Sequence, residues 1–148
     1  MNKVIAVIAA CVLAALPMGA AADEHGRAYT LGTVWSVGYV ETKPGKFDAY
    51  IEDLSNVWKA YLDQQIKDGT VVSYKVLTVV SPRDGEPNLL LLVESPNWAS
   101  FDLQNLEYFD ELAVKLQGSI KKSQTASIDR GALRDLRGGL LAQELNFK

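Results

Sequence analysis

The apolar residues of this chain change their period along the sequence, and the order of those changes constrains the fold most strongly. Apolar and small residues alternate with period two over Thr33–Val40, which is typical of a β-strand. Over Phe47–Ile66 the apolar residues recur at helical spacing, and Asp68-Gly69 ends the run. The pattern predicts one strand followed by a long, one-sided helix.

The next segments predict two strands joined by a turn. Thr70–Val80 is rich in β-branched and aromatic residues, and Pro82–Gly85 supplies residues that favour a tight turn. Leu89–Val93 follows as an uninterrupted apolar run, which indicates a strand buried on both faces.

The C-terminal half predicts further helices and a last strand. Ser95-Pro96 resembles a helix start, with serine as the cap and proline as the first helical residue. Helical periodicity follows, with a break near Gln104. We expect a shorter helix over Ser127–Arg137 that ends at Gly138-Gly139, and a final strand over Leu140–Phe147.

This order, β-α-β-β-α-(α)-β, predicts an α+β fold: a four-stranded antiparallel sheet with helices on one face. The opposite face would carry small apolar residues of the first strand and apolar residues of the third. Because an exposed apolar sheet face is unfavourable in water, we expect a second copy of the chain to cover it, which gives a homodimer.

Two local features point to a known superfamily. One is the strand Val34–Val40 that runs into Lys43-Pro44-Gly45-Lys46-Phe47, and the other is the segment Asn97–Phe101 after the third strand. From about Thr33 to Phe147 the chain resembles the dimeric α+β barrel superfamily, and in particular its small secreted members without assigned chemistry. The resemblance implies ferredoxin-like protomers packed sheet against sheet. That superfamily includes cofactor-free monooxygenases, isomerases, haem enzymes and stress-response proteins, so the fold alone does not define an activity.

The N-terminus predicts export. Lys3 precedes the apolar run Val4–Leu16, and small residues Ala20–Ala22 follow a Pro17/Gly19 break, as in a secretory signal peptide. The apolar run is too short to span a bilayer, so we expect no transmembrane segment in the mature protein. We expect cleavage between Ala22 and Asp23, a secreted or periplasmic location, and this organisation: signal peptide 1–22, flexible lead-in 23–32, single domain 33–148.

Two alternatives concern the same end of the chain. Ile8-Ala9-Ala10-Cys11 resembles a lipoprotein processing site, although Cys11 lies early and the apolar run continues past it. If the mature chain begins Asp23-Glu24-His25, its free amine, two amides and the imidazole would form a square-planar site for Cu(II) or Ni(II).

The composition excludes several classes of function. Eighteen acidic residues against fifteen basic ones give no basic face for nucleic acid. The single histidine, His25, precedes the domain, so we expect neither an axial haem ligand nor a histidine-based catalytic triad inside it. We therefore predict no cofactor and no metal site in the domain.

Aromatic residues give the positive signal for a site. We expect an apolar pocket between sheet and helices, with Trp35 and Tyr39 on its floor and Trp58, Tyr61 and Trp98 in its walls. Ordinary core packing is the alternative. The predicted ligand-binding residues are Trp35, Tyr39, Trp58, Tyr61, Tyr74, Trp98 and Arg134.

Three arginines suggest an anionic ligand. Arg130, Arg134 and Arg137 are spaced i, i+4 and i+7, so a helix there would present three guanidinium groups on one face. They would clamp an anion, or else form surface ion pairs with neighbours such as Asp129 and Asp135.

Two functions remain open. The first is a non-catalytic secreted or periplasmic homodimer that binds a small apolar, amphipathic or anionic ligand, or simply a partner surface. The alternative is a cofactor-independent monooxygenase- or isomerase-like enzyme, with Tyr39, Tyr61, Tyr74 and Arg134 as its candidate residues.

Overall fold

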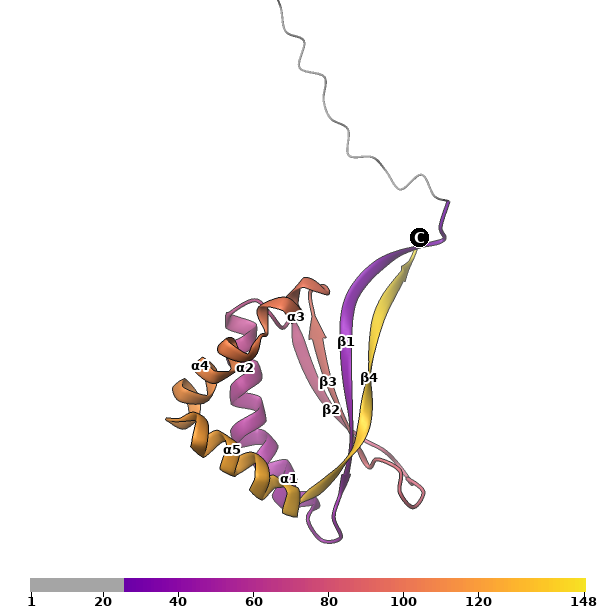
Figure 1. The fold of residues 1–148 in the computed structure, drawn as a ribbon. Coiled ribbons are helices and arrows are strands. Elements are labelled where there is room, and N and C mark those ends of the chain that lie inside the picture. The colour runs from indigo at the N-terminus through magenta and orange to yellow at the C-terminus, as the bar shows by residue number, and fades with distance from the viewer. Residues whose placement is uncertain (1–25) are drawn as a thin grey trace, which may run out of the picture.

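The computed structural model describes residues 26–148, which form a four-stranded antiparallel sheet with helices packed against it (Figure 1). The order of strands across the sheet is β2-β3-β1-β4, and every neighbouring pair is antiparallel. The predicted α+β class is confirmed. The strands are β1 (Tyr29–Thr42), β2 (Ser73–Thr78), β3 (Leu89–Ser95) and β4 (Arg134–Phe147).

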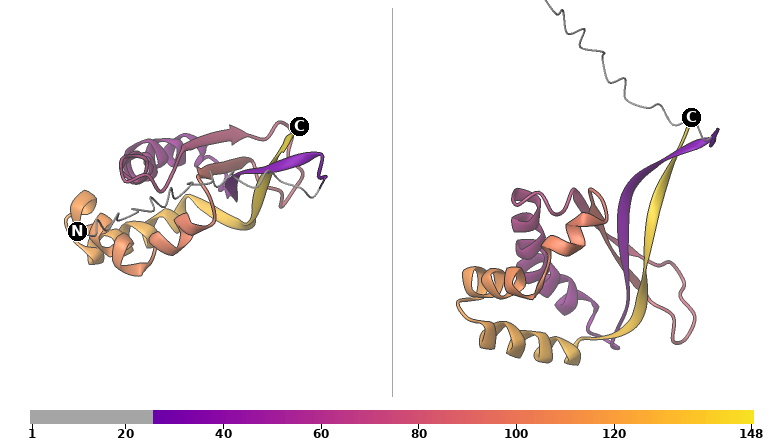
Figure 2. Two further views of the ribbon diagram at one scale, coloured as in Figure 1. Left: turned by 90° about the horizontal axis from the view of Figure 1, so that it is seen from above. Right: turned by 45° about the horizontal axis from the view of Figure 1, so that its top comes forward.

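The helices lie on one side of the sheet, as the views in Figures 1 and 2 agree. They fall into a first group between β1 and β2 and a second group between β3 and β4. The first group is α1 (Phe47–Asp53), η1 (Leu54–Trp58) and α2 (Lys59–Lys67). The second is α3 (Ala99–Leu103), α4 (Leu106–Gln117), α5 (Ile120–Asp129) and η2 (Arg130–Ala132).

The predicted long helix is confirmed, but it is not a regular α-helix. Its α1, η1 and α2 segments run without interruption from Phe47 to Lys67, and η1 is a π-helical turn in the middle. Gly69, with a φ of 76°, follows the end of the helix, where the absence of a side chain makes a positive φ favourable.

The predicted start of the second helical group is wrong. Ser95 does not cap a helix: it is the last residue of β3, pairs with Val34 of β1 and is buried. Pairing in the sheet therefore overrides the local capping preference, and helix α3 begins only at Ala99. The break near Gln104 is confirmed, because Gln104 leaves the helical conformation and Asn105 caps α4.

The predicted helix over Ser127–Arg137 is also wrong. Gly118, with a φ of 83°, ends α4, and Ser119 starts α5 by accepting a hydrogen bond from the amide of Lys122. Arg134 pairs with Thr42, so the strand β4 has already begun where the helix was expected to continue. The first strand also starts earlier than predicted, at Tyr29 rather than Thr33.

The core lies between the sheet and the first helical group. Val40, Tyr50, Leu54 and Leu89 form its buried centre, where the helix-facing sides of β1 and β3 meet α1 and η1. Alternate residues of a strand point to opposite faces, so Trp35, Val37 and Tyr39 lie on the face turned away from the helices.

We call the side of the sheet that is turned away from the helices its outer face. This face is apolar at its centre. Leu90 and Leu92 of β3 pair with Tyr39 and Val37 there, and Leu140 of β4 pairs with Val37 from the other side. Leu140 remains 45% exposed. The sheet thus presents an apolar surface that the chain's own helices do not cover.

Within residues 26–148, the helices lack the combination of length and apolar character that crossing a bilayer requires. The predicted signal peptide, the Cys11 processing site and the Asp23-Glu24-His25 metal site lie outside the described residues.

Candidate functional site

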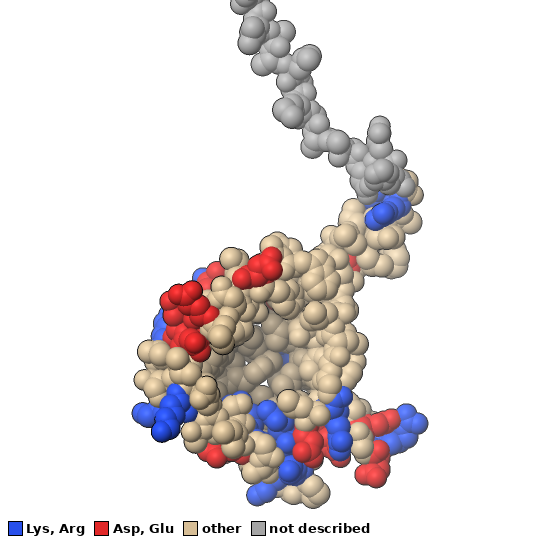
Figure 3. Space-filling view, in the orientation of Figure 1, with Lys and Arg blue, Asp and Glu red and all other residues tan. Residues whose placement is uncertain are grey.

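A cavity of about 330 Å³ lies between the two helical groups. Figure 3 also shows the surface hollowed between the helices and the long strands β1 and β4, whose residues do not line this cavity. The π-helical turn η1 and α2 form one wall of the cavity, α4 and α5 form the other, and η2 closes one end. The residues that define its chemistry are Trp58, Tyr61, Gln65, Phe109, Ser127 and Arg130.

The π-helical turn positions the aromatic wall. Single π-helical turns insert extra backbone into an α-helix and are frequent at functional sites. Here the turn ends at Trp58, whose indole packs edge-on against Tyr74 of β2, with ring centres 5.3 Å apart and an interplanar angle of 80°. This arrangement holds Trp58 between the cavity and the sheet.

Tyr74 is in turn fixed by Asp63 of α2. Its hydroxyl donates a hydrogen bond to Asp63 Oδ1 at 2.8 Å. Partial burial and this hydrogen bond raise the pKa of Tyr74 above its ordinary value. Tyr74 therefore acts as a neutral support behind Trp58.

Polar groups line part of the same cavity. The Tyr61 hydroxyl lies 3.2 Å from Ser123 Oγ and so links α2 to α5 across the cavity wall. Gln65 is buried on α2, and Ser127 lies one helical turn beyond Ser123. A few hydrogen-bonding groups on a mainly apolar wall are typical of sites for small molecules.

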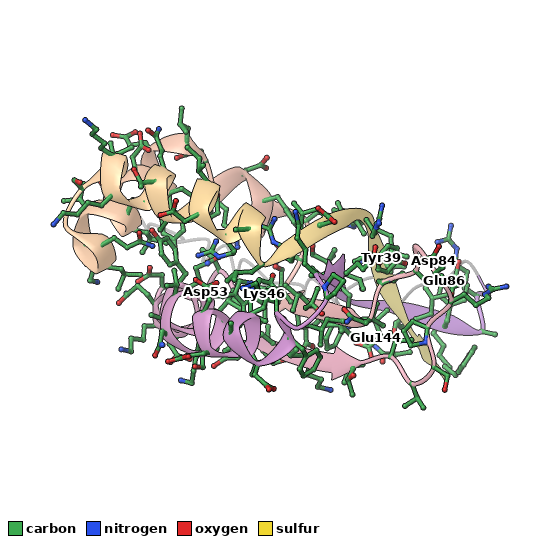
Figure 4. All side chains as sticks on the ribbon, turned by 90° about the horizontal axis from the view of Figure 1, so that it is seen from below. Tyr39, Lys46, Asp53, Asp84, Glu86 and Glu144 are labelled. Atoms are coloured by element: carbon green, nitrogen blue, oxygen red, sulfur yellow. The ribbon has the colours of Figure 1, made fainter. Side chains whose placement is uncertain are left out.

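A cluster of charged residues closes the η2 end. Arg130 Nε lies 2.5 Å from Asp53 Oδ2, and the two side chains are only 17% and 21% exposed. Figure 4 shows Asp53 on the side of α1 that faces α5. Arg130 also lines the cavity, so this ion pair borders it directly.

Arg134 extends this cluster toward the core. Its guanidinium carbon lies 6.0 Å from the centre of the Tyr50 ring, and its Nε is buried without a hydrogen-bond partner. Burial raises the pKa of Tyr50, while a hydrogen bond from Arg134 and the charges of Arg134 and Arg130 oppose that shift. Tyr50, Asp53, Arg130 and Arg134 thus form one interacting group, which we call the arginine cluster.

The structure brings some of the predicted site residues together. Trp58 and Tyr61 line the cavity, Tyr74 supports Trp58 from the sheet, and Arg134 lies in the arginine cluster. Trp98 lies at the start of α3, where its Nε1 donates to Gln143 of β4 at 3.0 Å.

Trp35 and Tyr39 lie on the outer face of the sheet, on the side opposite the helices. The Nζ atom of Lys75 approaches to 5.5 Å from the centre of the Trp35 ring. Figure 4 shows Tyr39 well separated from Asp53 at the arginine cluster. These two aromatic residues therefore lie away from the cavity between the helical groups.

The predicted helical arrangement of three arginines is wrong, because the chain changes from helix to strand between them. Arg130 lies on η2, whereas Arg134 and Arg137 lie on β4. Residues three apart in a strand point to opposite faces. Accordingly Arg137 donates to Glu41 at 2.6 Å, away from the arginine cluster.

The sequence interpretation missed the contribution of α5 to the cavity. Ser123 and Ser127 are spaced i, i+4 and lie on one face of this helix. The sequence does indicate where α5 starts, because Gly118-Ser119 is a helix-ending glycine followed by a capping serine. The π-helical turn has no comparable signal in the sequence.

A larger groove of about 680 Å³ runs along the outside of α4. It is lined by α4 and the first residue of α5, with Leu106, Val114 and Ile120 beside Glu107, Asp110 and Glu111. We place the site in the smaller cavity because segments of both helical groups enclose it and aromatic residues converge there.

Among residues 26–148, no group of three histidine, cysteine or carboxylate side chains is arranged to hold a metal ion. No family model, curated protein or solved structure matches this chain.

Proposed function

We propose that this chain binds a small apolar or amphipathic molecule in the cavity between its two helical groups. The observation that carries the proposal is the wall formed by Trp58, Tyr61 and Phe109 around about 330 Å³, with a few polar groups at its edge. This volume lies within the range of small-molecule sites in proteins.

The tyrosines favour binding over turnover. Tyr50 and Tyr74 both have pKa values raised by burial, so at neutral pH each is a neutral hydroxyl rather than a tyrosinate base. Neither side chain lines the cavity, so neither is placed to remove a proton from a ligand there.

We also propose that two ferredoxin-like protomers assemble through their outer faces into a dimeric α+β barrel. The strand order β2-β3-β1-β4, with both helical groups on one side, supports this protomer fold. The apolar outer face around Val37, Leu92 and Leu140 supports a sheet-to-sheet contact. We further propose that the protein is exported, on the basis of the signal sequence in residues 1–22.

A cavity-filling variant tests ligand binding. Ser127 lies on the cavity side of α5, whereas Thr125 lies on its outer surface. Trp58 fluorescence reports binding in a Trp35→Phe, Trp98→Phe background, and 1-octanol and octanoate serve as probes. We expect saturable binding that Ser127→Phe abolishes and Thr125→Phe preserves. Absence of saturable binding of either probe to the parent protein would exclude the proposal.

A further inference from the structure

Helix α4 is apolar on two sides, and the fold covers only one of them. Leu112 and Ala113 are buried against the rest of the chain. Leu106 and Val114 remain 78% and 52% exposed and line the groove of about 680 Å³ along the outside of the helix, which we call the α4 groove. Their spacing of i, i+8 places them on one face of α4. The α4 groove therefore has an apolar floor that residues 26–148 leave open to solvent.

Carboxylates flank this apolar floor. Glu107, Asp110 and Glu111 line the α4 groove together with one basic residue, Lys115. None of the three carboxylates forms an ion pair within the described part of the chain. Glu107 and Glu111 are also spaced i, i+4, and like charges at that spacing weaken a helix. Figure 3 shows acidic side chains gathered in the region of α4. The groove thus carries an excess of negative charge.

This arrangement of charge and apolar area is complementary to a basic amphipathic helix. Such a helix packs an apolar stripe into a groove and places lysine or arginine side chains beside it, where they meet carboxylates. α4 has 12 residues, so it extends for about 18 Å and can accommodate a partner helix of about three turns. Other occupants match less well. A second copy carries a net charge of -3, and an anionic lipid surface is repelled by the same carboxylates.

We propose that the α4 groove binds a basic amphipathic helix of a partner protein. The apolar side of that helix covers Leu106, Val114 and Ile120, and its lysine or arginine side chains pair with Glu107 and Glu111. This site is separate from the cavity between the two helical groups, because the groove and the cavity share no lining residue. The partner therefore docks without occupying the proposed ligand site.

A model peptide tests the electrostatic part of this proposal. The probe is a fluorescein-labelled amphipathic peptide of about 14 leucine and lysine residues, which as a helix is long enough to span α4. Its counterpart has glutamate in place of every lysine. By fluorescence anisotropy at low ionic strength, we expect the full-length protein to bind the lysine peptide saturably and about tenfold more tightly than the glutamate peptide. Added salt should weaken the binding, because it screens the charges.

Two double variants locate the binding at the groove. Glu107→Gln combined with Glu111→Gln should weaken binding of the lysine peptide about tenfold. Asp48→Asn combined with Glu52→Gln on α1 is the matched control and should change the affinity less than about twofold. The control removes the same charge, at the same i, i+4 spacing, from exposed residues that also start in the first turn of a helix.

A third pair of variants tests the apolar floor. Leu106→Ala should weaken binding of the lysine peptide about fivefold, because it removes apolar area from the contact. Ile128→Ala on α5 is its control, since Ile128 is 77% exposed and lies outside the groove. We expect that variant to bind like the parent protein.

Several results would overturn the proposal. Equal weakening by the two double variants would show that the peptide follows overall charge, and unchanged affinity of Leu106→Ala would place the peptide elsewhere. Absence of binding, or equal affinity for the two peptides, would also exclude it. If Leu106→Ala converts a dimer to a monomer in light scattering, a second copy occupies the groove. If it abolishes flotation with phosphatidylcholine vesicles, a lipid surface does.

Discussion

Arg134, the first residue of β4, holds its guanidinium carbon 6.0 Å from the centre of the Tyr50 ring in α1. A cation over an aromatic ring is attracted by its electron-rich face, most strongly where water is excluded. The contact joins the start of the last strand to the first helix. It therefore ties the arginine cluster to the buried core.

Stability should decline at alkaline pH in a way that depends on Tyr50. Burial raises the pKa of this hydroxyl above its ordinary value of 10.0. The folded state therefore holds the proton more tightly than the unfolded state, so the stability is fully present below pH 10.0 and is lost as the pH rises through the folded pKa. Urea unfolding from about pH 8 to about pH 11 measures the effect.

Tyr50→Phe should make that alkaline decline shallower. It should not abolish it, because Tyr74 and Tyr108 also have raised pKa values and contribute in the same direction. An identical pH profile for the variant and the parent protein would contradict the assignment to Tyr50.

The contact between Tyr61 and Ser123 should contribute measurably to stability. These hydroxyl oxygens lie 3.2 Å apart and join α2 to α5. Tyr61→Phe and Ser123→Ala should each lower the free energy of unfolding by about 0.5–1.5 kcal/mol. The double variant should cost less than the sum of the two, because the same hydrogen bond is lost in both. Strict additivity in urea unfolding would show that the hydroxyls do not interact.

Gly139 should not tolerate a side chain. A Cβ at this position would lie 2.6 Å from the carbonyl oxygen of Val37, which belongs to the rigid backbone of β1. We expect Gly139→Ala to lower the free energy of unfolding by about 1–3 kcal/mol. Gly131→Ala is the control, because a Cβ there would have no atom within 4 Å. Similar urea midpoints for the two variants would contradict the close approach of β4 to β1.

Substitutions of Leu140 and Leu141 should show whether the outer face forms the proposed dimer contact. Leu140 lies on the outer face and Leu141 on the helix-facing side, and they are 45% and 53% exposed. We expect Leu140→Glu to convert the proposed dimer to a monomer, since a charge would be buried in the proposed contact. Leu141→Glu should remain dimeric in light scattering coupled to size-exclusion chromatography. A monomeric parent protein would disprove the proposed assembly.

Periodicity predicted the strands and the first helix well, because long amphipathic patterns reflect the face that each segment buries. Prediction failed where a local preference competed with sheet pairing. Ser95 has the features of a helix cap, yet its pairing with Val34 keeps it in β3. Arg134 has helical spacing with Arg130, yet its pairing with Thr42 places it in β4. Such long-range pairings have no local signature.

The site could be predicted only in part. Trp58 and Tyr61 share a helical face, and that face lines the cavity. Trp35 is equally aromatic, but the alternation of strand residues sends it to the opposite side of the sheet. Composition identifies the aromatic residues but does not show which of them converge on one site. Likewise, Arg134 contacts Tyr50 only because β4 pairs with β1, a long-range contact that the sequence does not reveal.

The wide turn at Leu54–Trp58 holds more backbone than a turn of α-helix needs. It takes up this extra residue locally, so the helix beyond it stays in register with the helix before it. Removing one residue from the turn would therefore restore a regular α-helix and leave Trp58 and Tyr61 on the side that lines the cavity. Each residue of an α-helix advances the chain by about 100° around the axis. Removing a residue from α2 between Trp58 and Tyr61 would instead turn Tyr61 away from the cavity wall by about that angle. The first helix should therefore accept a one-residue deletion within Leu54–Trp58 far more readily than one within α2.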